Sequence, residues 1–289
     1  MTIKIAHISD LHFSHLTFSP SQFFSKRWIG NINLIFSRKQ DYQPEKLHGL
    51  ADYFAKTGIT HLFITGDLST TSLDEEFKKA KDFIESFEKV GIQVFAIPGN
   101  HDHYTKSSYK ENTFYYFFKE RFVETYPFSL KTNRVTATRL SSKWWLAAMD
   151  TAYATSLISS RGRFSENIEK ELRALLSKIP KEENILLLNH FPLFQNDSPR
   201  KELLRADALQ TLLKEHPNVK LYLHGHSHRH CIADLRSCGY PVVLDSGSTA
   251  RHKEGTWNLL ELSDDICNIT AFHHKNGEWA SFKNAMVQW

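Results

Sequence analysis

The sequence has few cysteines, and their spacing gives them no structural role. Cys231, Cys238 and Cys267 are an odd number, and no Cys-x-x-Cys pair occurs. Neither a disulfide framework nor a thiolate zinc site is therefore indicated. We expect reduced thiols that pack as small apolar groups.

Long apolar runs are missing as well. No stretch reaches the roughly 20 apolar residues that span a bilayer, and Asn31 and Asn33 interrupt the most apolar window, 28–36. The N-terminus lacks the charged start, apolar stretch and small-residue cleavage site of a secretory signal. The sequence thus predicts a cytoplasmic protein without a membrane span.

Charge of one sign is not in large excess. Lys and Arg number 36 against 32 Asp and Glu, a formal net charge of +4. Without a dense Lys/Arg run, this charge gives little drive for nucleic-acid binding, so we expect no nucleic-acid partner. With 41% hydrophobic residues, the 289-residue chain can bury a sizeable core, and we expect a single domain over 1–289.

Short apolar runs that stop at polar or glycine-bearing loops recur along the chain. They predict strands near residues 3–8, 61–65, 94–97, 185–188, 221–223 and 242–244. Trp144-Trp145 is expected to begin a further core strand, and 257–262 with 266–272 predicts a β-hairpin. Helices are predicted over about 72–90, where Ser72-Leu-Asp-Glu75 fits a capping box, and over 165–179 and 206–216. This alternation indicates an α/β fold with its ligands at the carboxyl ends of the strands.

The loops after five of these strands contain residue types that bind metals. In chain order they are Asp10-x-His12, Gly66-Asp67, Gly99-Asn100-His101-Asp102, His190 and Gly225-His226-x-His228. Carboxylate, amide carbonyl and imidazole groups are ligands for divalent and trivalent cations, and the glycines let the backbone turn tightly beside them. Each motif alone has an ordinary explanation as a turn, a cap or a structural histidine. Together, each at the end of a separate strand, they predict a metal site.

This order of motifs resembles the calcineurin-like metallophosphoesterase superfamily. The resemblance implies a four-layer α/β/β/α sandwich with two central mixed β-sheets and two metal ions at the strand carboxyl ends. It implies that one metal is bound by Asp10, His12 and His228, that the other is bound by Asn100, His190 and His226, and that Asp67 bridges both. We expect manganese, with iron or zinc as alternatives.

The resemblance also implies a hydrolytic mechanism. Two cations lower the pKa of a bridging water, so that hydroxide can attack phosphorus near neutral pH. The resemblance places His101 near the substrate phosphate, where imidazole can donate a proton. Asp102 is a second catalytic candidate that orients His101 or binds the loop backbone, with a surface turn residue as the alternative. Arg161, Arg163 and Tyr104 are candidate substrate contacts, although lone arginines are usually solvated.

The substrate class is predicted from the sequence around these motifs. The segment Gly66-Asp-Leu-Ser-Thr-Thr-Ser72 lacks the Asp-Arg-Gly of Ser/Thr protein phosphatases. The order of Met149-Asp-Thr151, Arg161-Gly-Arg163 and Asn189-His-Phe-Pro192 is similar to class III cyclic nucleotide phosphodiesterases, which usually have His-His-Pro-Pro at the last motif. We expect a phosphodiesterase acting on a small nucleotide-type phosphoester. A pyrophosphohydrolase of a nucleotide-linked lipid such as UDP-diacylglucosamine and a nuclease are the alternatives. A non-catalytic scaffold is disfavoured because every ligand position holds a competent residue type.

Residues 13–43 stand apart as an insert in which aromatic and basic side chains alternate. The apolar and basic residues of this insert are Phe13, Leu16, Phe18, Phe23, Phe24, Lys26, Arg27, Trp28, Ile29, Leu34, Phe36, Arg38 and Lys39. Such a segment could hold a lipid substrate or contact an anionic membrane surface. The alternative is a helical insertion that packs its aromatics on the core and leaves its charges in water. The oligomeric state is open.

Overall fold

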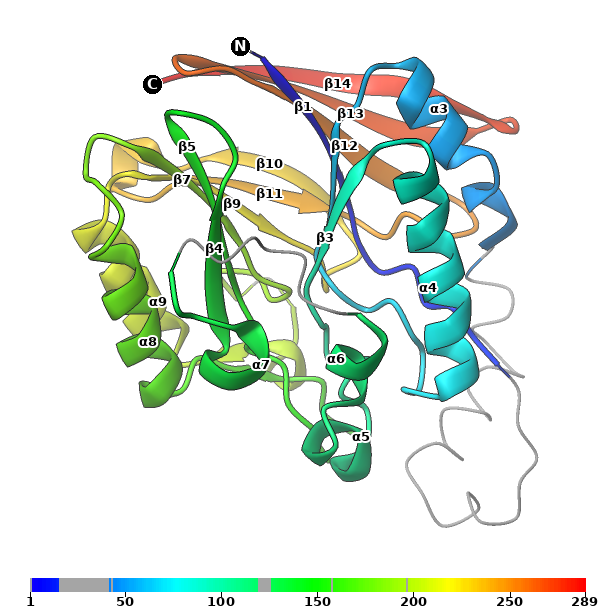
Figure 1. Cartoon of the computed structure of the whole chain (residues 1–289), viewed down its shortest axis with the longest axis horizontal. Coiled ribbons are helices and arrows are strands. Elements are labelled where there is room, and N and C mark those ends of the chain that lie inside the picture. The colour runs from blue at the N-terminus through cyan, green and yellow to red at the C-terminus, as the bar shows by residue number, and fades with distance from the viewer. Residues whose placement is uncertain (1, 16–41, 43, 119–125, 157, 196) are drawn as a thin grey trace.

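The computed structural model describes residues 2–15, 42, 44–118, 126–156, 158–195 and 197–289. Two six-stranded mixed sheets pack against each other at the centre, and helices cover their outer faces (Figure 1). The expected four-layer α/β/β/α sandwich is thereby confirmed. Most of the insert at 13–43, and with it the choice between a lipid or membrane contact and a packed helical insertion, lies outside the described residues.

The first sheet has the strand order β14-β13-β12-β1-β2-β3. Its strands are β1 (Ile3–Ile8), β2 (His61–Ile64), β3 (Gln93–Ala96), β12 (Thr256–Leu262), β13 (Ile266–Lys275) and β14 (Glu278–Gln288). β1, β2 and β3 are parallel, so their carboxyl ends meet at one edge of the sheet. The predicted hairpin is confirmed as β12 and β13. β14 extends it and was not predicted, because most of this strand is exposed and has no continuous apolar run.

The second sheet has the order β10-β11-β9-β7-β5-β4. Its strands are β4 (Val135–Arg139), β5 (Trp144–Met149), β7 (Asn184–Leu188), β9 (Val219–His224), β10 (His230–Asp234) and β11 (Val242–Ser246). The four central strands, β5, β7, β9 and β11, are parallel. They are buried on both faces, which explains their nearly continuous apolar sequences. The strand expected at Trp144-Trp145 is confirmed as β5.

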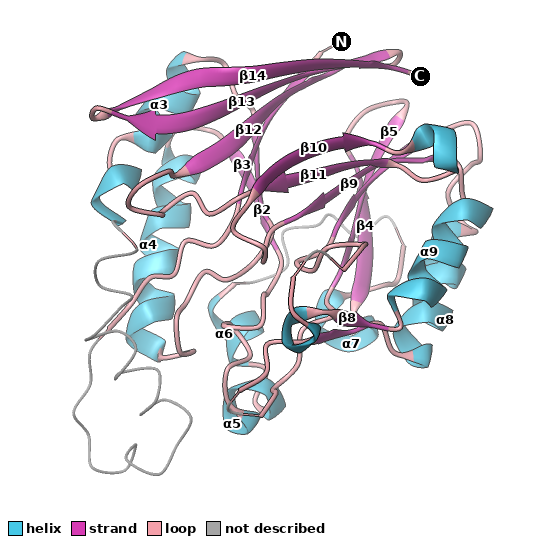
Figure 2. Ribbon diagram, turned by 180° about the vertical axis from the view of Figure 1, so that it is seen from behind, coloured by secondary structure: helices cyan, strands magenta, loops and turns pink. Residues whose placement is uncertain are grey.

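The helices lie outside the sheets. They are α3 (Leu50–Lys56), α4 (Asp74–Lys89), α5 (Lys106–Lys110), α6 (Thr113–Phe117), α7 (Leu130–Asn133), α8 (Glu166–Leu176) and α9 (Ala206–Glu215), with 3₁₀ turns η3 (Pro44–Leu47), η4 (Pro199–Lys201) and η5 (Arg236–Cys238). A small parallel pair, β6 (Gly162–Arg163) and β8 (Leu203–Leu204), completes the elements of the described residues. Figure 2 shows β8 and the short helices α5 to α7 at the lower edge, opposite the end where β13 and β14 lie.

The predicted capping box at Ser72 is wrong. α4 begins two residues later, and the Glu76 carboxylate accepts a hydrogen bond from the Leu73 N–H at 3.2 Å. The Ser72 hydroxyl instead donates to the His101 carbonyl at 2.7 Å. Ser72 therefore joins two loops rather than capping a helix. The helix predicted from Ser165 is confirmed as α8, and the Ser165 hydroxyl caps it by accepting from the Ile168 N–H.

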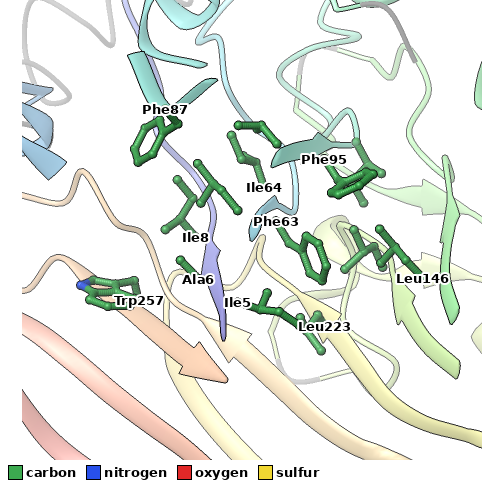
Figure 3. Packing of buried hydrophobic residues seen from close by; sticks show 14 of the residues in the cluster. Ile5, Ala6, Ile8, Phe63, Ile64, Phe87, Phe95, Leu146, Leu223 and Trp257 are labelled. Atoms are coloured by element: carbon green, nitrogen blue, oxygen red, sulfur yellow. The ribbon is translucent and has the colours of Figure 1, made fainter. Parts of the chain in front are cut away.

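The core between the sheets fixes how the strand ends are placed. Ile5 and Phe63 of the first sheet meet Leu146 and Leu223 of the second, and all four side chains are fully buried (Figure 3). Burial of each such side chain contributes about 1.5–3 kcal/mol, so the two sheets cannot slide without a large loss of stability. The loops at their edges are thereby held on a rigid base.

The structure also tests the expectations about the cysteines and about membrane-spanning helices. The three cysteines are free, but only Cys267 packs in the core; Cys231 and Cys238 are exposed, so their predicted burial is wrong. Within the part of the chain that the structure describes, no helix is both long and apolar enough to cross a membrane.

Candidate metal centre

The loops after β1, β2, β3, β7 and β9 converge at one edge of the two sheets. Backbone hydrogen bonds join them: Asp10 N–H donates to the Gly66 carbonyl and His12 N–H to the Asp67 carbonyl, each at 3.0 Å. On the other sheet, Gly225 N–H donates to the His190 carbonyl at 3.1 Å. The five predicted motifs, which are spread over more than two hundred residues of sequence, are thus brought to one place.

One group of side chains combines Asp10, His12, Asp67 and His228. One potential ligand atom from each lies within 4.8 Å of all the others. Asp10 Oδ1 lies 2.9 Å from His228 Nε2, and the Nε2 atoms of His12 and His228 lie 3.3 Å apart. Asp67 Oδ2 is 3.8 Å from His12 Nε2. Two carboxylates and two imidazoles therefore face a common point.

A second group combines Asp67, His190 and His226. His190 Nε2 lies 3.5 Å from Asp67 Oδ2 and 3.2 Å from His226 Nδ1. The side-chain oxygen of Asn100 approaches His190 Nε2 at 3.2 Å and adds an amide oxygen to this set. Asp67 belongs to both groups, so the two potential cation positions share one carboxylate.

This donor set fits cations. Asp10 Oδ1 is buried and has no well-aligned hydrogen-bond donor, although His228 Nε2 lies 2.9 Å away. Such an arrangement is costly for a carboxylate unless a positive charge faces it. Imidazole nitrogens of two different histidines also point at each other in each group, at 3.2–3.3 Å. Two lone pairs at that distance repel unless a proton or a cation lies between them. The residues can therefore hold two metal ions.

Backbone carbonyls behind the site determine which nitrogen of His190 and of His226 faces it. His190 Nδ1 donates to the Thr65 carbonyl at 2.7 Å, which leaves Nε2 for a cation. His226 has the reverse arrangement, because its Nε2 donates to the Lys201 carbonyl at 3.0 Å and leaves Nδ1. Such backbone carbonyls fix both the tautomer and the ring orientation of a ligating histidine.

The electric field of the site favours a bound positive charge, whether a proton or a metal cation. Burial opposes ionisation of Asp67, yet His190 and other nearby histidines hold its pKa well below its usual range. Burial likewise opposes protonation of His190, but Asp67 and Asp10 outweigh it and raise the pKa of His190 to about 9. Burial together with His190 lowers the pKa of His226 to about 3. The field that favours a proton on His190 favours a metal cation in the same way.

Comparison with known proteins agrees with this geometry. A family model described as calcineurin-like phosphoesterase matches residues 3–230. The chain belongs to this family. Membership makes it a metallophosphoesterase, an enzyme that hydrolyses phosphoric esters, and implies two divalent metal ions.

Individual relatives of this calcineurin-like phosphoesterase have been found by sequence and by fold. It is 25% identical over 218 residues to the 3′,5′-cyclic adenosine monophosphate phosphodiesterase CpdA of Haemophilus influenzae, covering 71% of this chain and 70% of that protein. Its fold is similar to that of a dimetal phosphatase from Danio rerio, with a TM-score of 0.64, 12% identity and coverage of 99% and 98% of the two chains. It is also similar to purple acid phosphatase PPD1 from yellow lupin seeds, with a TM-score of 0.66, 11% identity and coverage of 100% of this chain and 54% of the lupin chain.

Five of the candidate metal-binding residues have a left-handed backbone. The φ angles are 55° for Asp10, 48° for His12, 53° for Asp67, 67° for His226 and 56° for His228. Non-glycine residues rarely adopt this conformation, although Asp and His tolerate it better than most. Such strain persists where the surroundings enforce it, and it concentrates at functional sites. No local sequence pattern predicts the left-handed conformation in this phosphoesterase. The packing of the loops against one another therefore enforces it.

The glycines of the motifs serve mainly to make room. Of these glycines only Gly66 has a positive φ, 101°. The expected tight turns are present at the other two, because the Gly99 carbonyl accepts from the Asp102 N–H at 3.2 Å and the Gly225 carbonyl accepts from the Ser227 N–H at 2.8 Å. A Cβ at Gly99 would lie 2.2 Å from Asp67 Oδ1, and one at Gly225 would lie 2.4 Å from Asp10 Oδ2. The backbone of these loops therefore packs directly against the carboxylates.

Gly99→Ala is expected to displace the Asp67 carboxylate and to lower metal occupancy in this phosphoesterase. The clash should also destabilise the fold by about 1–3 kcal/mol, the usual cost of overpacking. Metal analysis and thermal unfolding measure the two effects. Gly91→Ala is the matched control: Gly91 has a φ of 83°, but outside its own neighbours no atom of the described residues lies within 4 Å of where a Cβ would stand. This control should lose stability and keep its metal, whereas normal metal content in Gly99→Ala would contradict the prediction.

His101 lies beside both metal groups. Its backbone N–H donates to Asp67 Oδ1 at 2.7 Å, and its ring Nδ1 donates to the Thr70 carbonyl at 2.6 Å. The ring of Tyr104 stacks on the His101 ring, with centroids 5.4 Å apart and planes 15° from parallel. Tyr104 thus helps to position His101, and its contact with substrate stays a prediction.

Asp102 is buried and binds loop backbone, so its reading as a surface turn residue is wrong. Its carboxylate accepts hydrogen bonds from the backbone N–H groups of Gly99, Leu68 and Ser69 at 2.8–3.1 Å, and from the Ser69 hydroxyl at 2.8 Å. Burial and the nearby Asp67 raise the pKa of Asp102 to about 6. Asp102 therefore ties the loop after β3 to the loop after β2.

The two candidate arginines have protein partners. Arg161 Nη2 lies 3.0 Å from Glu202 Oε1, and its Nε donates to the Pro199 carbonyl at 2.7 Å. The Arg163 guanidinium lies over the Tyr153 ring, 4.9 Å from its centroid. A role for either arginine in substrate binding stays a prediction.

Sequence reasoning missed two residues that support the site. The Tyr42 hydroxyl lies 3.2 Å from His228 Nδ1, and the Tyr42 ring centroid is 4.5 Å from that of His12. Asp245, at the end of β11, accepts from the Ser227 hydroxyl at 2.5 Å and so holds the residue between His226 and His228. Asp245 ends an apolar run as the other motifs do, which is the one signal that could have found it.

A buried carboxylate, Asp150, supports the loop that contains His101. It accepts from His103 Nε2 at 3.2 Å and from the Tyr115 hydroxyl at 2.7 Å, and it pairs with Arg134. Burial opposes its charge, but His103 and Arg134 more than compensate and lower the pKa of Asp150 to about 2. The ionised form is therefore the one that stabilises the folded protein.

Asp150→Asn is expected to lower the free energy of unfolding at pH 7 by about 2 kcal/mol or more. Because the folded-state pKa is depressed, this stabilisation is present above about pH 4, the unfolded pKa, and is lost as the pH falls toward 2. Urea unfolding measures the free energy of unfolding of both proteins at pH 7 and at pH 3. The difference between Asp150→Asn and wild type should be larger at pH 7. The control is Asp82→Asn, an exposed carboxylate on α4. An equal loss at both pH values would refute the role of the Asp150 charge.

Proposed function

We propose that this enzyme is a phosphodiesterase that hydrolyses a small nucleotide-type phosphoester. The observation that supports it most directly is the 25% identity to a cyclic adenosine monophosphate phosphodiesterase over 71% of the chain. The two groups of candidate ligands that share Asp67 support it as well, because a paired cation site suits attack on a phosphodiester.

The proposal assigns each side chain a role. Asp10, His12 and His228 bind one cation, Asn100, His190 and His226 bind the other, and Asp67 contacts both. The mixture of oxygen and nitrogen donors suits manganese, iron and zinc, and we propose manganese as the activating ion. When bound, the ions would supply positive charge that clamps the phosphoryl oxygens and lowers the pKa of water.

The residues of the chain position the substrate and move the proton. Thr70 and Tyr104 hold the His101 ring, so the proton that it can pass to the leaving oxygen is at Nε2. The hydrogen bond from His101 N–H to Asp67 keeps this ring at a fixed place relative to both ligand groups. Asp102 maintains that arrangement by holding the two loops together.

A substrate panel tests the proposal. The purified protein, loaded in turn with manganese, iron or zinc, is assayed with 4-nitrophenyl phosphate, bis(4-nitrophenyl) phosphate, 3′,5′-cyclic adenosine monophosphate (cAMP) and a UDP-linked diphosphate. The proposal expects manganese-dependent hydrolysis of the two diesters, with the higher kcat/KM for cAMP. Hydrolysis of the UDP-linked diphosphate alone would replace the proposal with a pyrophosphohydrolase.

A further inference from the structure

Glu76 is a buried carboxylate in the first turn of α4, outside the two groups of candidate metal ligands. Its oxygens accept hydrogen bonds from the backbone N–H groups of Thr71 at 2.7 Å, Leu73 at 3.2 Å and His15 at 3.2 Å. The Thr71 hydroxyl donates to the same carboxylate at 3.1 Å. Glu76 therefore ties α4 to the loop after β2 and to the segment that follows β1.

The negative charge of Glu76 costs stability. Burial raises the pKa of this carboxyl from its ordinary value of 4.5 to about 7, although the hydrogen bonds from Thr71 and Leu73 lower it. Because the folded-state pKa is raised, the free energy of unfolding falls as the pH rises from about 4.5 to 7, where the carboxyl ionises. Stability near neutral pH thus does not explain a carboxylate here, and such perturbed groups are enriched at functional sites.

The loop that Glu76 holds is the loop that holds His101. The Thr70 carbonyl accepts from His101 Nδ1 at 2.6 Å, and the Ser72 hydroxyl donates to the His101 carbonyl at 2.7 Å. Thr70 and Ser72 are the two neighbours of Thr71, which Glu76 binds through both its N–H and its hydroxyl. The ring and the backbone of His101 are therefore both attached to the stretch of loop that Glu76 fixes.

The nearby metal ligands depend less on this stretch. The Thr70 hydroxyl donates to the His12 carbonyl at 3.0 Å. The backbone of His12 also has a support of its own, because its N–H donates to the Asp67 carbonyl at 3.0 Å. Loss of Glu76 is thus expected to displace the His101 ring while the candidate ligands stay in place.

We propose that Glu76 is a positioning residue for the proton donor of this phosphodiesterase. Through Thr71 and its two neighbours, it holds the His101 ring where Nε2 can pass a proton to the leaving oxygen. The inference rests on the proposed function, and it adds that α4, which supplies no candidate ligand, controls the geometry of proton transfer.

A double-mutant cycle in kcat for cAMP tests this role. The full-length, manganese-loaded proteins are wild type, Glu76→Ala, His101→Asn and the variant with both changes. We expect Glu76→Ala to lower kcat about tenfold or more, the scale of loss when a catalytic group is misplaced. In the His101→Asn background the same change should cost less than about twofold, because residues that act through one another are not additive.

Three further measurements separate positioning from a general defect. The loss of kcat in Glu76→Ala should be smaller for bis(4-nitrophenyl) phosphate, whose leaving group needs little protonation, and metal content should not change. Glu75→Ala, an exposed carboxylate in the same turn, is the control and should match wild type. An equal loss of kcat in both backgrounds, or loss of metal from Glu76→Ala, would overturn the inference.

A milder variant covers the case in which circular dichroism shows that Glu76→Ala is unfolded. Glu76→Gln keeps the size of the side chain and one acceptor oxygen. It should lower kcat for cAMP by about fivefold, as expected for the weakening of one hydrogen bond. The same lack of additivity with His101→Asn is expected, and an additive loss would overturn the inference here too.

Nitrogen-15 NMR of the histidine rings tests the inference without turnover. The protein is loaded with zinc because manganese broadens nearby signals, and the His101 signals are identified by their absence from His101→Asn. We expect Glu76→Gln to shift the Nδ1 signal of His101, and Glu75→Gln to leave it unchanged. An unshifted His101 signal in Glu76→Gln would overturn the inference. Absence of cAMP turnover by wild type contradicts the proposed function instead, and the NMR result then decides the role of Glu76.

Discussion

Asp67→Asn is expected to lower kcat by more than about a hundredfold. This loss exceeds the roughly 10- to 100-fold loss of activity that usually follows removal of a residue supporting a metal ligand. Asp67 Oδ2 lies 3.5 Å from His190 Nε2 and 3.8 Å from His12 Nε2, so one carboxylate serves both ligand groups. Asparagine keeps the size of the side chain but loses its negative charge and one acceptor oxygen. Both cations should therefore be lost together with activity.

Metal content per chain, measured by inductively coupled plasma mass spectrometry, checks this prediction alongside kcat. Asp82→Asn removes an exposed carboxylate of α4 and should change neither quantity. Because Asp67 Oδ1 also accepts the His101 N–H at 2.7 Å, circular dichroism must show that the variant is folded. A folded Asp67→Asn that keeps two metal ions would show that Asp67 does not bridge them.

His101→Asn is expected to keep both metal ions and to lower kcat by about 10²–10⁴, the usual contribution of a general acid or base. The ring of His101 lies beside the ligand groups, 4.9 Å from the His12 ring centroid, and its Nδ1 is held by the Thr70 carbonyl. Substitution leaves the backbone N–H that donates to Asp67. The cation site should therefore survive while proton transfer is lost.

The ratio of kcat to metal content decides this prediction. The fall in kcat should be smaller for an aryl diester such as bis(4-nitrophenyl) phosphate than for cAMP, because the aryl leaving group needs little protonation. A purely structural defect would lower kcat for both substrates alike. His48→Asn, at an exposed histidine before α3, is the control. An empty metal position in His101→Asn would show that His101 is a ligand and that its assignment as an acid is wrong.

The sequence anticipated the residue types of the site better than their environment. Asp10, Asp67 and His190 could be identified because each follows an apolar strand, and parallel strands bring their carboxyl ends to one edge. The capping box assigned to Ser72 failed because its hydroxyl has a partner distant in sequence, His101, which no local pattern reveals. Tyr42 was missed for the same reason, since its partners His12 and His228 are distant in sequence, His228 by 186 residues.

By itself, the sequence determined the strand pattern, the order of the ligand motifs and hence the family and the reaction class, because strand ends and residue chemistry are local properties. The resemblance already implied that Asp67 is shared, and the structure places it in both ligand groups. Only the tertiary structure decided which nitrogen of His190 and of His226 faces the site and why Gly99 and Gly225 must lack a side chain. The physical reason is that these properties depend on distances of a few ångströms between loops from two different sheets. The packing of those sheets sets these distances, and no segment of the chain contains them alone.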